Sequence, residues 1–427
     1  MAELPQTLVK VLDSLEVAEE KSDAKLCANS LRLLHGLRGQ VTLEVIASLL
    51  KTITNVQVKW SEAPYVYTVT YKSTEVNFYL AILSVMLLTK QNRLRESEEI
   101  AMELIMKPHS RTAQPLLAKM FYYLGLIYEL KADYNVKNFL VWYRGACLRH
   151  DTFSQAVLIN VILRFYLLND RVRLAKEFSE KSGFPETAGY PEIARNQFYL
   201  GKIKALTLNY VEAHGHLVQA ARKAPENGAN GFKLAVEKLR ILVELLMGEI
   251  PLRKSLLGMK GLLSYIEIIR AVRSGELEKF KAALNTHQSV FTEDMNYSLV
   301  IRLRHIVIKS GLKRINLAYS VISLEDIANK LGLKTNDTEF IVAKAIRDGV
   351  IEATIDHENK VLRSKVLEDV YTTNDPQILL KKRIDFCIGL RNDTVKTMQF
   401  SQNKASANPK ESNEEIDFDL LSDDDDF

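Results

Sequence analysis

Apolar residues recur every three to four positions along most of the chain, which is the spacing of amphipathic helices. The pattern begins with Leu4, Leu8, Val11, Leu12 and Leu15. It becomes strong from Glu75 onward, where long helical stretches follow one another with short connections. Only residues 64–71 (PYVYTVTY) alternate aromatic and β-branched residues with others, and they fit a short strand or a loop equally well. The chain is therefore predicted to be mostly helical.

Two parts of the helical region repeat each other. Tyr123-Leu124-Gly125 and Tyr199-Leu200-Gly201 lie 76 residues apart, and each has a tyrosine nine residues after its glycine. This distance fits two helix hairpins of about 38 residues. The second copy also matches the tetratricopeptide (TPR) spacing at Leu200, Gly201, Ala213, Leu217, Ala220 and Pro225. Small residues there would let two antiparallel helices approach closely, and Pro225 would end the second helix. We expect a right-handed, TPR-like solenoid; an irregular helical array is the alternative.

The pattern changes after residue 320. Ser323 and Asp326 resemble a capping box that opens a helix, and a second helix over 338–348 would stop at Gly349. Residues 350–355 then alternate, with Ile351, Ala353 and Ile355 on one face. A polar turn over 356–360 leads to a second short apolar strand. Two helices followed by a two-stranded hairpin are the order of a winged helix.

One more helix is predicted near the end. Asp375 would be its N-cap and Pro376 its first residue. Its apolar positions are spaced for packing against other helices: Leu380, Ile384, Cys387, Ile388, Val395 and Met398. Beyond Phe400 the sequence consists mainly of Ser, Asn, Lys and acidic residues, which predicts disorder. The predicted organisation is an N-terminal helical segment (1–74), a solenoid (75–300), a winged-helix domain (301–372), a C-terminal helix (373–400) and an acidic tail (401–427).

Composition agrees with a helical protein inside the cell. The chain has only 18 glycines and 10 prolines in 427 residues, too few for a many-stranded β protein. Three distant cysteines without a CxxC pair cannot build a zinc ribbon or a disulfide framework, so we expect a reducing compartment. No run of 18 apolar residues occurs, and the N-terminus does not resemble a signal peptide. We therefore expect a soluble intracellular protein.

The net charge of +4 is the sum of a basic region and an acidic C-terminal region. Residues 401–427 hold two lysines against nine acidic residues, a net charge of −7. Residues 1–400 consequently hold 55 basic against 44 acidic residues, a net charge of +11. A basic body suits an acidic partner.

A search for catalytic or metal-binding patterns finds one candidate. His214 and His216 form an HxH pair, but Ala224 and Asn227 stand where a zinc protease that removes ubiquitin would need Ser and Asp. No HExxH, Gly-x-Ser-x-Gly or GxxxxGK[ST] pattern occurs. The sequence therefore predicts a scaffold rather than an enzyme, with no catalytic residue, cofactor or metal.

A winged helix can bind DNA, but the second helix is a poor reader of bases. Six of its residues are apolar and its four charged residues sum to zero, so we expect it to be buried on more than one side. The free edge of the hairpin could instead extend the sheet of a neighbouring protein. Basic residues gather elsewhere and could meet phosphates, meet an acidic segment or form a solvated helix face: Arg302, Arg304, Lys309, Lys313, Arg314, Lys381, Lys382 and Arg383.

A helical array that runs directly into a winged helix resembles the PCI-domain family. LLSYIEIIRAVRSGELEKF (262–280) is similar to the junction pattern of that family. Residues 231–253, 299–331 and 339–358 more closely resemble PCI subunits of the 26S proteasome regulatory-particle lid. Two alternatives are a PCI subunit of the signalosome or of translation initiation factor three, and an mRNA-export PCI protein that binds nucleic acid. EFIVAKAIRDGVIEA (339–353) argues against the first.

The resemblance implies a non-catalytic subunit that scaffolds the lid and supports ubiquitin-dependent degradation in the cytoplasm and nucleus. Its partners would be other PCI subunits and a small acidic disordered subunit, without membrane or nucleic acid. Such subunits join wing to wing, and their C-terminal helices gather in one bundle. On this chain the wing contact would fall on Ile351, Ala353, Ile355, Val361 and Leu362. The bundle contact would fall on Leu380, Ile384, Ile388, Val395 and Met398.

Overall fold

The computed structural model describes residues 6–21, 24–37, 74–106, 110–225, 228–252, 261–365 and 373–403. The chain forms two compact units, Met1–Leu362 and Arg363–Phe427. The possible strand at 64–71 and the tail from residue 404 lie outside the described residues.

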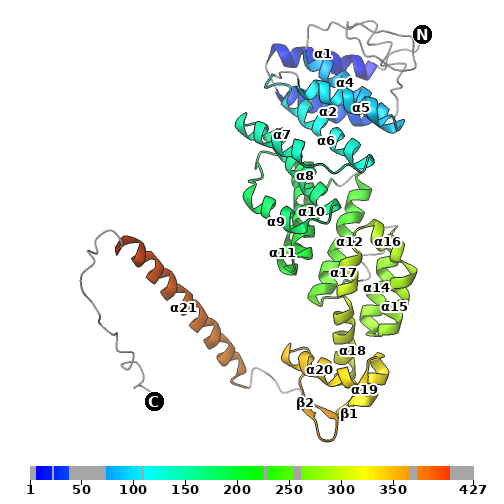
Figure 1. Cartoon of the computed structure of the whole chain (residues 1–427), viewed down its shortest axis with the longest axis vertical. Helices are drawn as coiled ribbons and strands as arrows, with labels where there is room; N and C mark the ends of the chain where they lie inside the picture. The colour runs from blue at the N-terminus through cyan, green and yellow to red at the C-terminus, as the bar shows by residue number, and fades with distance from the viewer. Residues whose placement is uncertain are drawn as a thin grey trace. The chain divides into compact units, whose positions relative to one another are not determined.

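The first unit opens with helices packed around a central one (Figure 1). These helices are α1 (Gln6–Glu20), α2 (Ala24–Leu37), α4 (Thr74–Lys90) and α5 (Leu94–Met106). In α4 the consecutive residues from Phe78 to Leu80 and from Ile82 to Leu83 are all buried. A helix that is apolar all round has no face for solvent. Helix α4 accordingly packs against α1, α5 and α6 (Gln114–Leu130).

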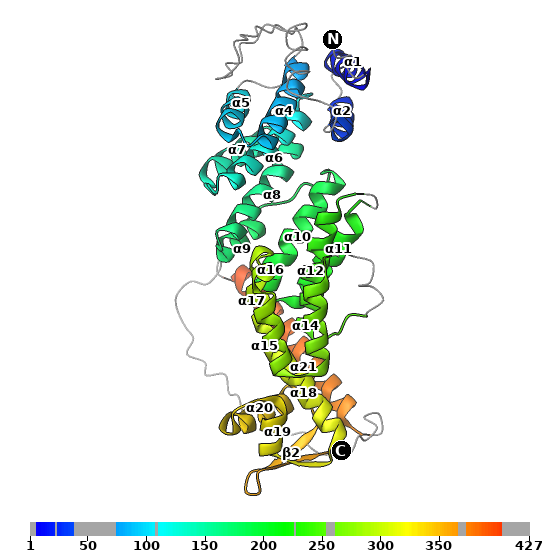
Figure 2. The same cartoon turned by 90° about the vertical axis from the view of Figure 1, so that its right-hand side faces the viewer.

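The repeat region follows as stacked helix pairs (Figures 1 and 2). Its helices are α6 (Gln114–Leu130), α7 (Lys137–Leu148), α8 (Thr152–Leu168), α9 (Val172–Lys181), α10 (Tyr190–Leu206), α11 (Tyr210–Lys223) and α12 (Asn230–Met247). The first helices of successive pairs, α6, α8 and α10, begin 38 residues apart. Helix α8 packs against both α6 and α10. The helical-repeat architecture predicted from the sequence is therefore confirmed.

The two copies of the Tyr-Leu-Gly motif make different contacts. A Cβ atom on Gly201 would lie 2.9 Å from Leu217 Cγ, so glycine is what lets α10 and α11 approach. Helix α11 ends at Lys223, two residues before Pro225, as expected. In the first copy, a Cβ on Gly125 would instead lie 3.0 Å from Val161 of α8. The connection from α6 to α7 is longer than that from α10 to α11, which places α7 differently.

The end of the repeat region joins the winged helix at a contact between two glycines. Here the helices are α14 (Leu263–Ser274), α15 (Leu277–Thr286), α16 (Gln288–Glu293), α17 (Tyr297–Arg302) and α18 (Arg304–Ala318). A Cβ on Gly275, whose φ is +68°, would lie 2.5 Å from Gly311 Cα. A Cβ on Gly311 would lie 2.5 Å from Leu331 Cδ2 and 2.7 Å from the Gly275 carbonyl oxygen. No side chain fits at either position.

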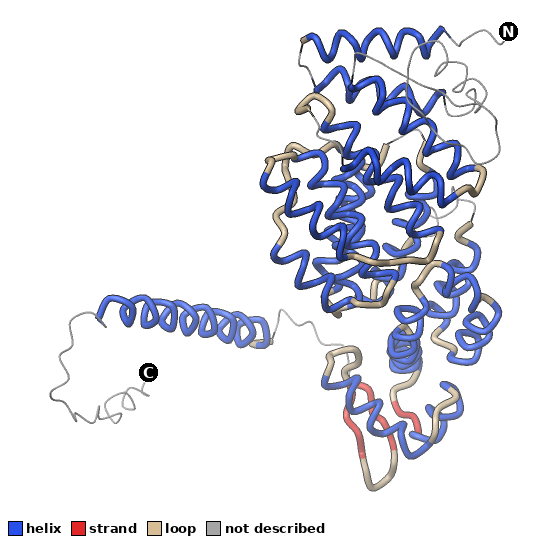
Figure 3. Tube along the Cα trace, turned by 45° about the horizontal axis from the view of Figure 1, so that its top comes forward, coloured by secondary structure: helices blue, strands red, loops and turns tan. Residues whose placement is uncertain are grey.

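The winged helix contains three strands rather than the two that were predicted (Figure 3). Its elements are β1 (Val321–Ser323), α19 (Leu324–Leu331), α20 (Thr335–Arg347), β2 (Ala353–Asp356) and β3 (Val361–Ser364), with sheet order β1-β3-β2. Ser323 caps α19 as expected: its Oγ accepts the Asp326 N–H at 3.1 Å and donates to Asp326 Oδ2 at 2.7 Å. Gly349 follows α20 with φ of +69°, as its position past a helix end predicted.

The prediction that the second helix of the winged-helix domain, now α20, is buried on more than one side is wrong. Helix α20 buries Thr338, Val342 and Ala345 along a single face. Phe340 is 77% exposed and Ala343 is exposed as well. Composition alone cannot separate the buried from the exposed apolar residues of α20. The core of the winged helix is small, and only the residues that face it are covered.

The second unit contains α21 (Asp375–Asn403), longer than the helix predicted over 373–400. Asp375 is already its first helical residue rather than its cap, a shift of one position. Within this unit the described apolar side chains of α21 are exposed.

Substituting Gly311 tests the glycine contact. Alanine normally favours a helix interior over glycine by about 1 kcal/mol, but here the added Cβ has no room. We expect Gly311→Ala to lower the unfolding free energy by about 1–3 kcal/mol, seen as a lower thermal midpoint by circular dichroism. Gly215→Ala is the matched control, because α11 leaves open space around Gly215, and it should be neutral or stabilising. Equal stability of the two variants would contradict the contact.

Candidate interaction surfaces

The histidine pair of the sequence analysis lies in a packed helix pair. On α11, His216 Nδ1 lies 2.6 Å from Gln197 Oε1 of α10, and burial lowers the pKa of His216. His214 Nδ1 lies 4.0 Å from Glu244 Oε1 of α12. Among the residues that the structure describes, no group of three or more His, Cys, Asp or Glu side chains could hold a metal ion. In the same residues, no helix combines the length and apolar character needed to cross a membrane.

The predicted wing residues divide by burial. Ile351, Ala353 and Leu362 are buried in the core between the sheet and the helices, and Ile355 and Val361 are half-buried. Strand β3 pairs with β1 on one side and β2 on the other, so residues 361–364 have no free edge. Strand β2 lies at an edge of the sheet, and so does β1, a strand that the sequence analysis missed because it is only three residues long. The wing contact itself stays a prediction.

The predicted bundle residues form one of two apolar stripes on α21. The first stripe consists of Leu380, Ile384, Ile388, Val395 and Met398, each between 41% and 69% exposed in this unit. A second stripe, which the sequence analysis did not identify, consists of Leu379, Phe386 and Leu390. Their spacing of seven and four residues places them on a face of their own. The helix can therefore contact apolar neighbours on two sides.

Several basic residues of the junction have structural partners. The Arg302 guanidinium donates to the carbonyl oxygens of Ala205 and Leu206, at 3.3 and 3.2 Å, at the end of α10. Arg314 donates to the Ser274 carbonyl at the end of α14, at 3.3 Å. Cations at helix C-termini satisfy carbonyls that lack partners within the helix. Binding the carbonyls at helix ends is thus a third role for these residues, besides partner binding and solvation.

Lys309 also has an internal partner. Its Nζ lies 2.9 Å from Asp348 Oδ2, and this bond links α18 to the residue that follows α20. Hydrogen bonds from Lys309 and Arg347 lower the pKa of Asp348. The lysine thus helps to position the winged helix rather than to offer charge to a partner.

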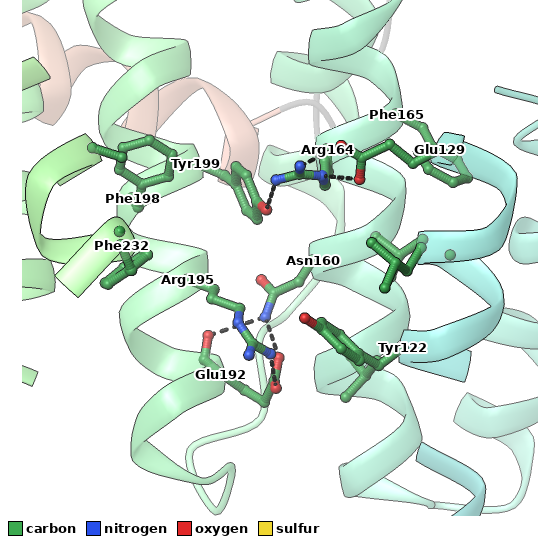
Figure 4. Close-up of a pocket in the computed structure, with 16 residues that line it drawn as sticks. Tyr122, Glu129, Asn160, Arg164, Phe165, Glu192, Arg195, Phe198, Tyr199 and Phe232 are labelled. Carbon is green, nitrogen blue, oxygen red and sulfur yellow. Dashed lines mark hydrogen bonds and ion pairs between the residues drawn. The ribbon is translucent and has the colours of Figure 1, made fainter. Parts of the chain in front are cut away.

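A cavity of about 330 Å³ lies among α6, α8, α10 and the first turns of α12 (Figure 4). We call it the repeat groove. Its polar lining consists of Tyr122, Glu129, Asn160, Arg164, Glu192, Arg195 and Tyr199. Phe165, Phe198 and Phe232 are among its apolar lining residues. Sequence reasoning missed this site because its residues come from four helices and span more than 100 positions.

Arg164 links the first helices of three successive pairs, α6, α8 and α10, in the repeat groove. Its Nε donates to Glu129 Oε2 of α6 at 2.7 Å, and its Nη1 donates to Tyr199 Oη of α10 at 3.3 Å (Figure 4). Each partner is 35 residues away, so the contacts follow the repeat. Burial alone would lower the pKa of Arg164, but the hydrogen bond to Glu129, together with Tyr199, raises it above its ordinary value. The guanidinium therefore stays charged and paired.

Arg195 makes a second pairing on the other side of the groove. It forms an ion pair with Glu192 on the same helix, and its guanidinium carbon lies 4.8 Å from the centre of the Tyr122 ring of α6. A guanidinium at that distance is attracted to the ring. Burial lowers the pKa of Arg195, but the charge of Glu192 more than offsets this, so its pKa is raised.

Lys202 is a buried cation close to these residues. It lies on α10, three positions after Tyr199, and is 6% exposed. Burial, and then the charge of Arg164, lower the pKa of Lys202 to about 8, while Asp294 acts in the opposite direction. Keeping this ammonium charged inside the protein costs stability at neutral pH.

Lys202→Met should therefore stabilise the protein at neutral pH. Between pH 8 and 10.5 folded Lys202 has lost its proton while the unfolded chain still holds it, so wild-type stability rises with pH there. We expect the variant to gain up to about 3 kcal/mol at pH 7, and the gain to shrink as the pH approaches 10.5. Thermal midpoints of both proteins at pH 7, 8, 9 and 10.5 measure this. A difference that is independent of pH would contradict it.

Comparison with protein-family models gives three consecutive matches. A model described as "PSMD3-like, N-terminal TPR repeats" matches residues 51–260. The PCI domain model matches residues 284–365, which contain the winged helix. A model of the C-terminal region of a proteasome regulatory subunit matches residues 369–426, which contain α21.

Curated relatives span most of the chain. A probable 26S proteasome non-ATPase regulatory subunit 3 from Anopheles stephensi is 42% identical over 372 residues, covering 83% of this chain and 74% of the relative. The probable regulatory subunit rpn3 of Schizosaccharomyces pombe is 42% identical, covering 76% and 68%. A subunit 3 homologue from Arabidopsis thaliana is 34% identical and covers 93% and 88%.

Proposed function

The chain belongs to the family of 26S proteasome non-ATPase regulatory subunit 3, and from this premise we propose that it is a structural subunit of the regulatory-particle lid. The observation that supports this most strongly is the order of the three matched models, which together run from residue 51 to 426. The relatives reported above are not named for the signalosome, translation initiation factor three or mRNA export, so the comparisons give those alternatives no support.

We infer a non-catalytic role in ubiquitin-dependent degradation, in the cytoplasm and nucleus. The relatives are named non-ATPase subunits, and a PCI domain is present. Two features of the chain suit assembly with other proteins: the edge strand β2 of the sheet, and helix α21 with its two exposed apolar stripes.

The first stripe of α21 is proposed as the bundle contact, with the second stripe facing another neighbour. Helices with exposed apolar stripes gain stability by burying them against other helices. Burying a Leu, Ile, Val or Met side chain contributes about 1.5–3 kcal/mol. The five residues of the stripe can therefore decide whether the chain enters the lid.

Charging the first stripe tests the bundle contact and the proposed function together. We expect Leu380→Glu/Ile384→Glu/Ile388→Glu to leave the thermal midpoint of the chain unchanged, because these side chains are exposed in their own unit. The variant should be absent from the lid on native gels and after affinity purification of another lid protein. The control places three glutamates on the polar side of the helix, at Lys382, Asn392 and Lys396, and should assemble. Normal assembly of the first variant would overturn the bundle assignment.

The wing contact is proposed at the outer edge of β2. Successive N–H groups of an edge strand point alternately to its partner strand and away from it. Proline removes one N–H, so single prolines at Thr354 and Ile355 test both directions. The proline that replaces the residue whose N–H points outward should keep the thermal midpoint but prevent lid assembly. The control Thr354→Val should keep the thermal midpoint and still assemble. Assembly by every proline variant that stays folded would contradict the edge model.

The small acidic partner is proposed to contact exposed basic residues. An open groove of about 590 Å³ near the end of α11 is lined by Tyr190, Pro191, Arg222, Lys223 and Pro225. Lys223 Nζ lies 5.0 Å from the centre of the Tyr190 ring. The net charge of +11 over residues 1–400 supports attraction of an acidic chain to this body.

A further inference from the structure

One charged residue interrupts the first stripe of α21. Arg391 lies three positions after Ile388 and four positions before Val395. Ile384 and Met398 lie farther along the helix, each seven positions from Arg391. Side chains at these spacings share one face of a helix, so Arg391 stands within the stripe rather than beside it. It lies 16 positions after the first residue of α21 and 12 before the last, close to the middle of the helix.

Arg391 has no acidic partner on its own helix. The residues three and four positions away from it are Cys387, Ile388, Thr394 and Val395. In the part of the chain that the structure describes, its side chain is exposed, and its Nη1 donates to Asn392 Oδ1 at 3.4 Å. An arginine keeps its proton in proteins. The stripe therefore carries a positive charge that α21 does not neutralise.

Packing another helix on the first stripe would take this charge out of water. Ile388 and Val395 flank Arg391 on the same face, so a helix that covers both of them also covers the arginine. A buried charge is costly unless a group of opposite charge pairs with it. Because α21 supplies no such group, the helix that packs against it must.

The acceptor that fits Arg391 is a side-chain carboxylate. Elsewhere in this chain, Arg302 and Arg314 bind carbonyl oxygens at helix ends. A helix that runs alongside the middle of α21 presents its side there, where its own carbonyls are already hydrogen-bonded within the helix. Only its side chains can meet the guanidinium, and an aspartate or glutamate supplies the negative charge.

We propose that Arg391 selects the partner of the first stripe. That partner is a helix of another lid subunit with an aspartate or glutamate set among its apolar residues, facing Arg391. The five apolar residues alone would accept many apolar helices in several registers. One charged residue in an apolar seam restricts both the partner and the register. This inference rests on the proposed bundle contact.

A neutral replacement tests the proposal in the assembled lid. Arg391→Leu extends the apolar stripe, and leucine and arginine have similar helix propensities. Facing a carboxylate, the variant leaves that group buried and unpaired. When it is expressed together with the wild-type chain and the lid is purified through another subunit, we expect at least tenfold less of the variant in the lid. Equal or greater incorporation would overturn the proposal, because leucine suits an apolar neighbour or solvent at least as well.

Two control variants separate the position of the charge from its presence. Lys396→Leu removes one positive charge from the polar side of α21 and should enter the lid like the wild type. Arg391→Lys keeps the charge and should enter better than Arg391→Leu. The isolated chains should share one thermal midpoint, because both side chains are exposed in their own unit. An equal loss with Lys396→Leu and Arg391→Leu would overturn the proposal, since position would then not matter.

A charge exchange identifies the facing residue. Arg391→Glu should be excluded from the lid, because two carboxylates would then face each other. Each acidic residue in the C-terminal helices of the other PCI subunits is then replaced singly by arginine, and one replacement should restore entry of Arg391→Glu. Restoration by none would overturn the proposal. Exclusion of the wild-type chain from the lid would instead overturn the proposed function.

Discussion

The contact between Gly275 and Gly311 holds the two halves of the first unit at a fixed distance. Helix α18 can lie against the end of α14 only because neither backbone carries a Cβ at that point. With this spacing, neighbouring residues of α18 enter different cores. Val307 packs with the repeat helices, whereas Ile308 packs with the winged helix. Leu333 contacts both cores. The winged helix is therefore a continuation of the repeat packing rather than a separate module on a linker.

Local signals in the sequence predicted local structure well. Ser323 marks the start of α19, Gly349 follows α20, and Pro225 stands just past α11, because caps and breakers act within a few residues of their own position. The same local logic could not orient α20, where Phe340 and Val342 are equally apolar in sequence but Phe340 is exposed and Val342 is buried.

Features that depend on distant residues were not predictable. The repeat groove combines residues of α6, α8, α10 and α12. Of its two ion pairs, Arg164–Glu129 joins residues 35 positions apart, and Arg195–Glu192 lies within α10. A sequence shows such arginines only as positive charges. Arg302, Arg314 and Lys309 were likewise counted as a basic cluster, although their partners sit on elements that only folding brings near. Folding gives each of these cations a specific acceptor, so their charges are paired within the chain.

The bond between Arg302 and the end of α10 also sets an order of events during synthesis. The last carbonyls of α10 belong to Ala205 and Leu206, and their donor is made 96 or more residues later. At about 5–20 residues per second, that interval lasts roughly 5–20 s. Through it, the Ala205 carbonyl already has the Leu208 N–H as a donor at 3.4 Å, whereas the Leu206 carbonyl is left to water. Arg302 can therefore bind the end of α10 only after α10 itself has left the ribosome.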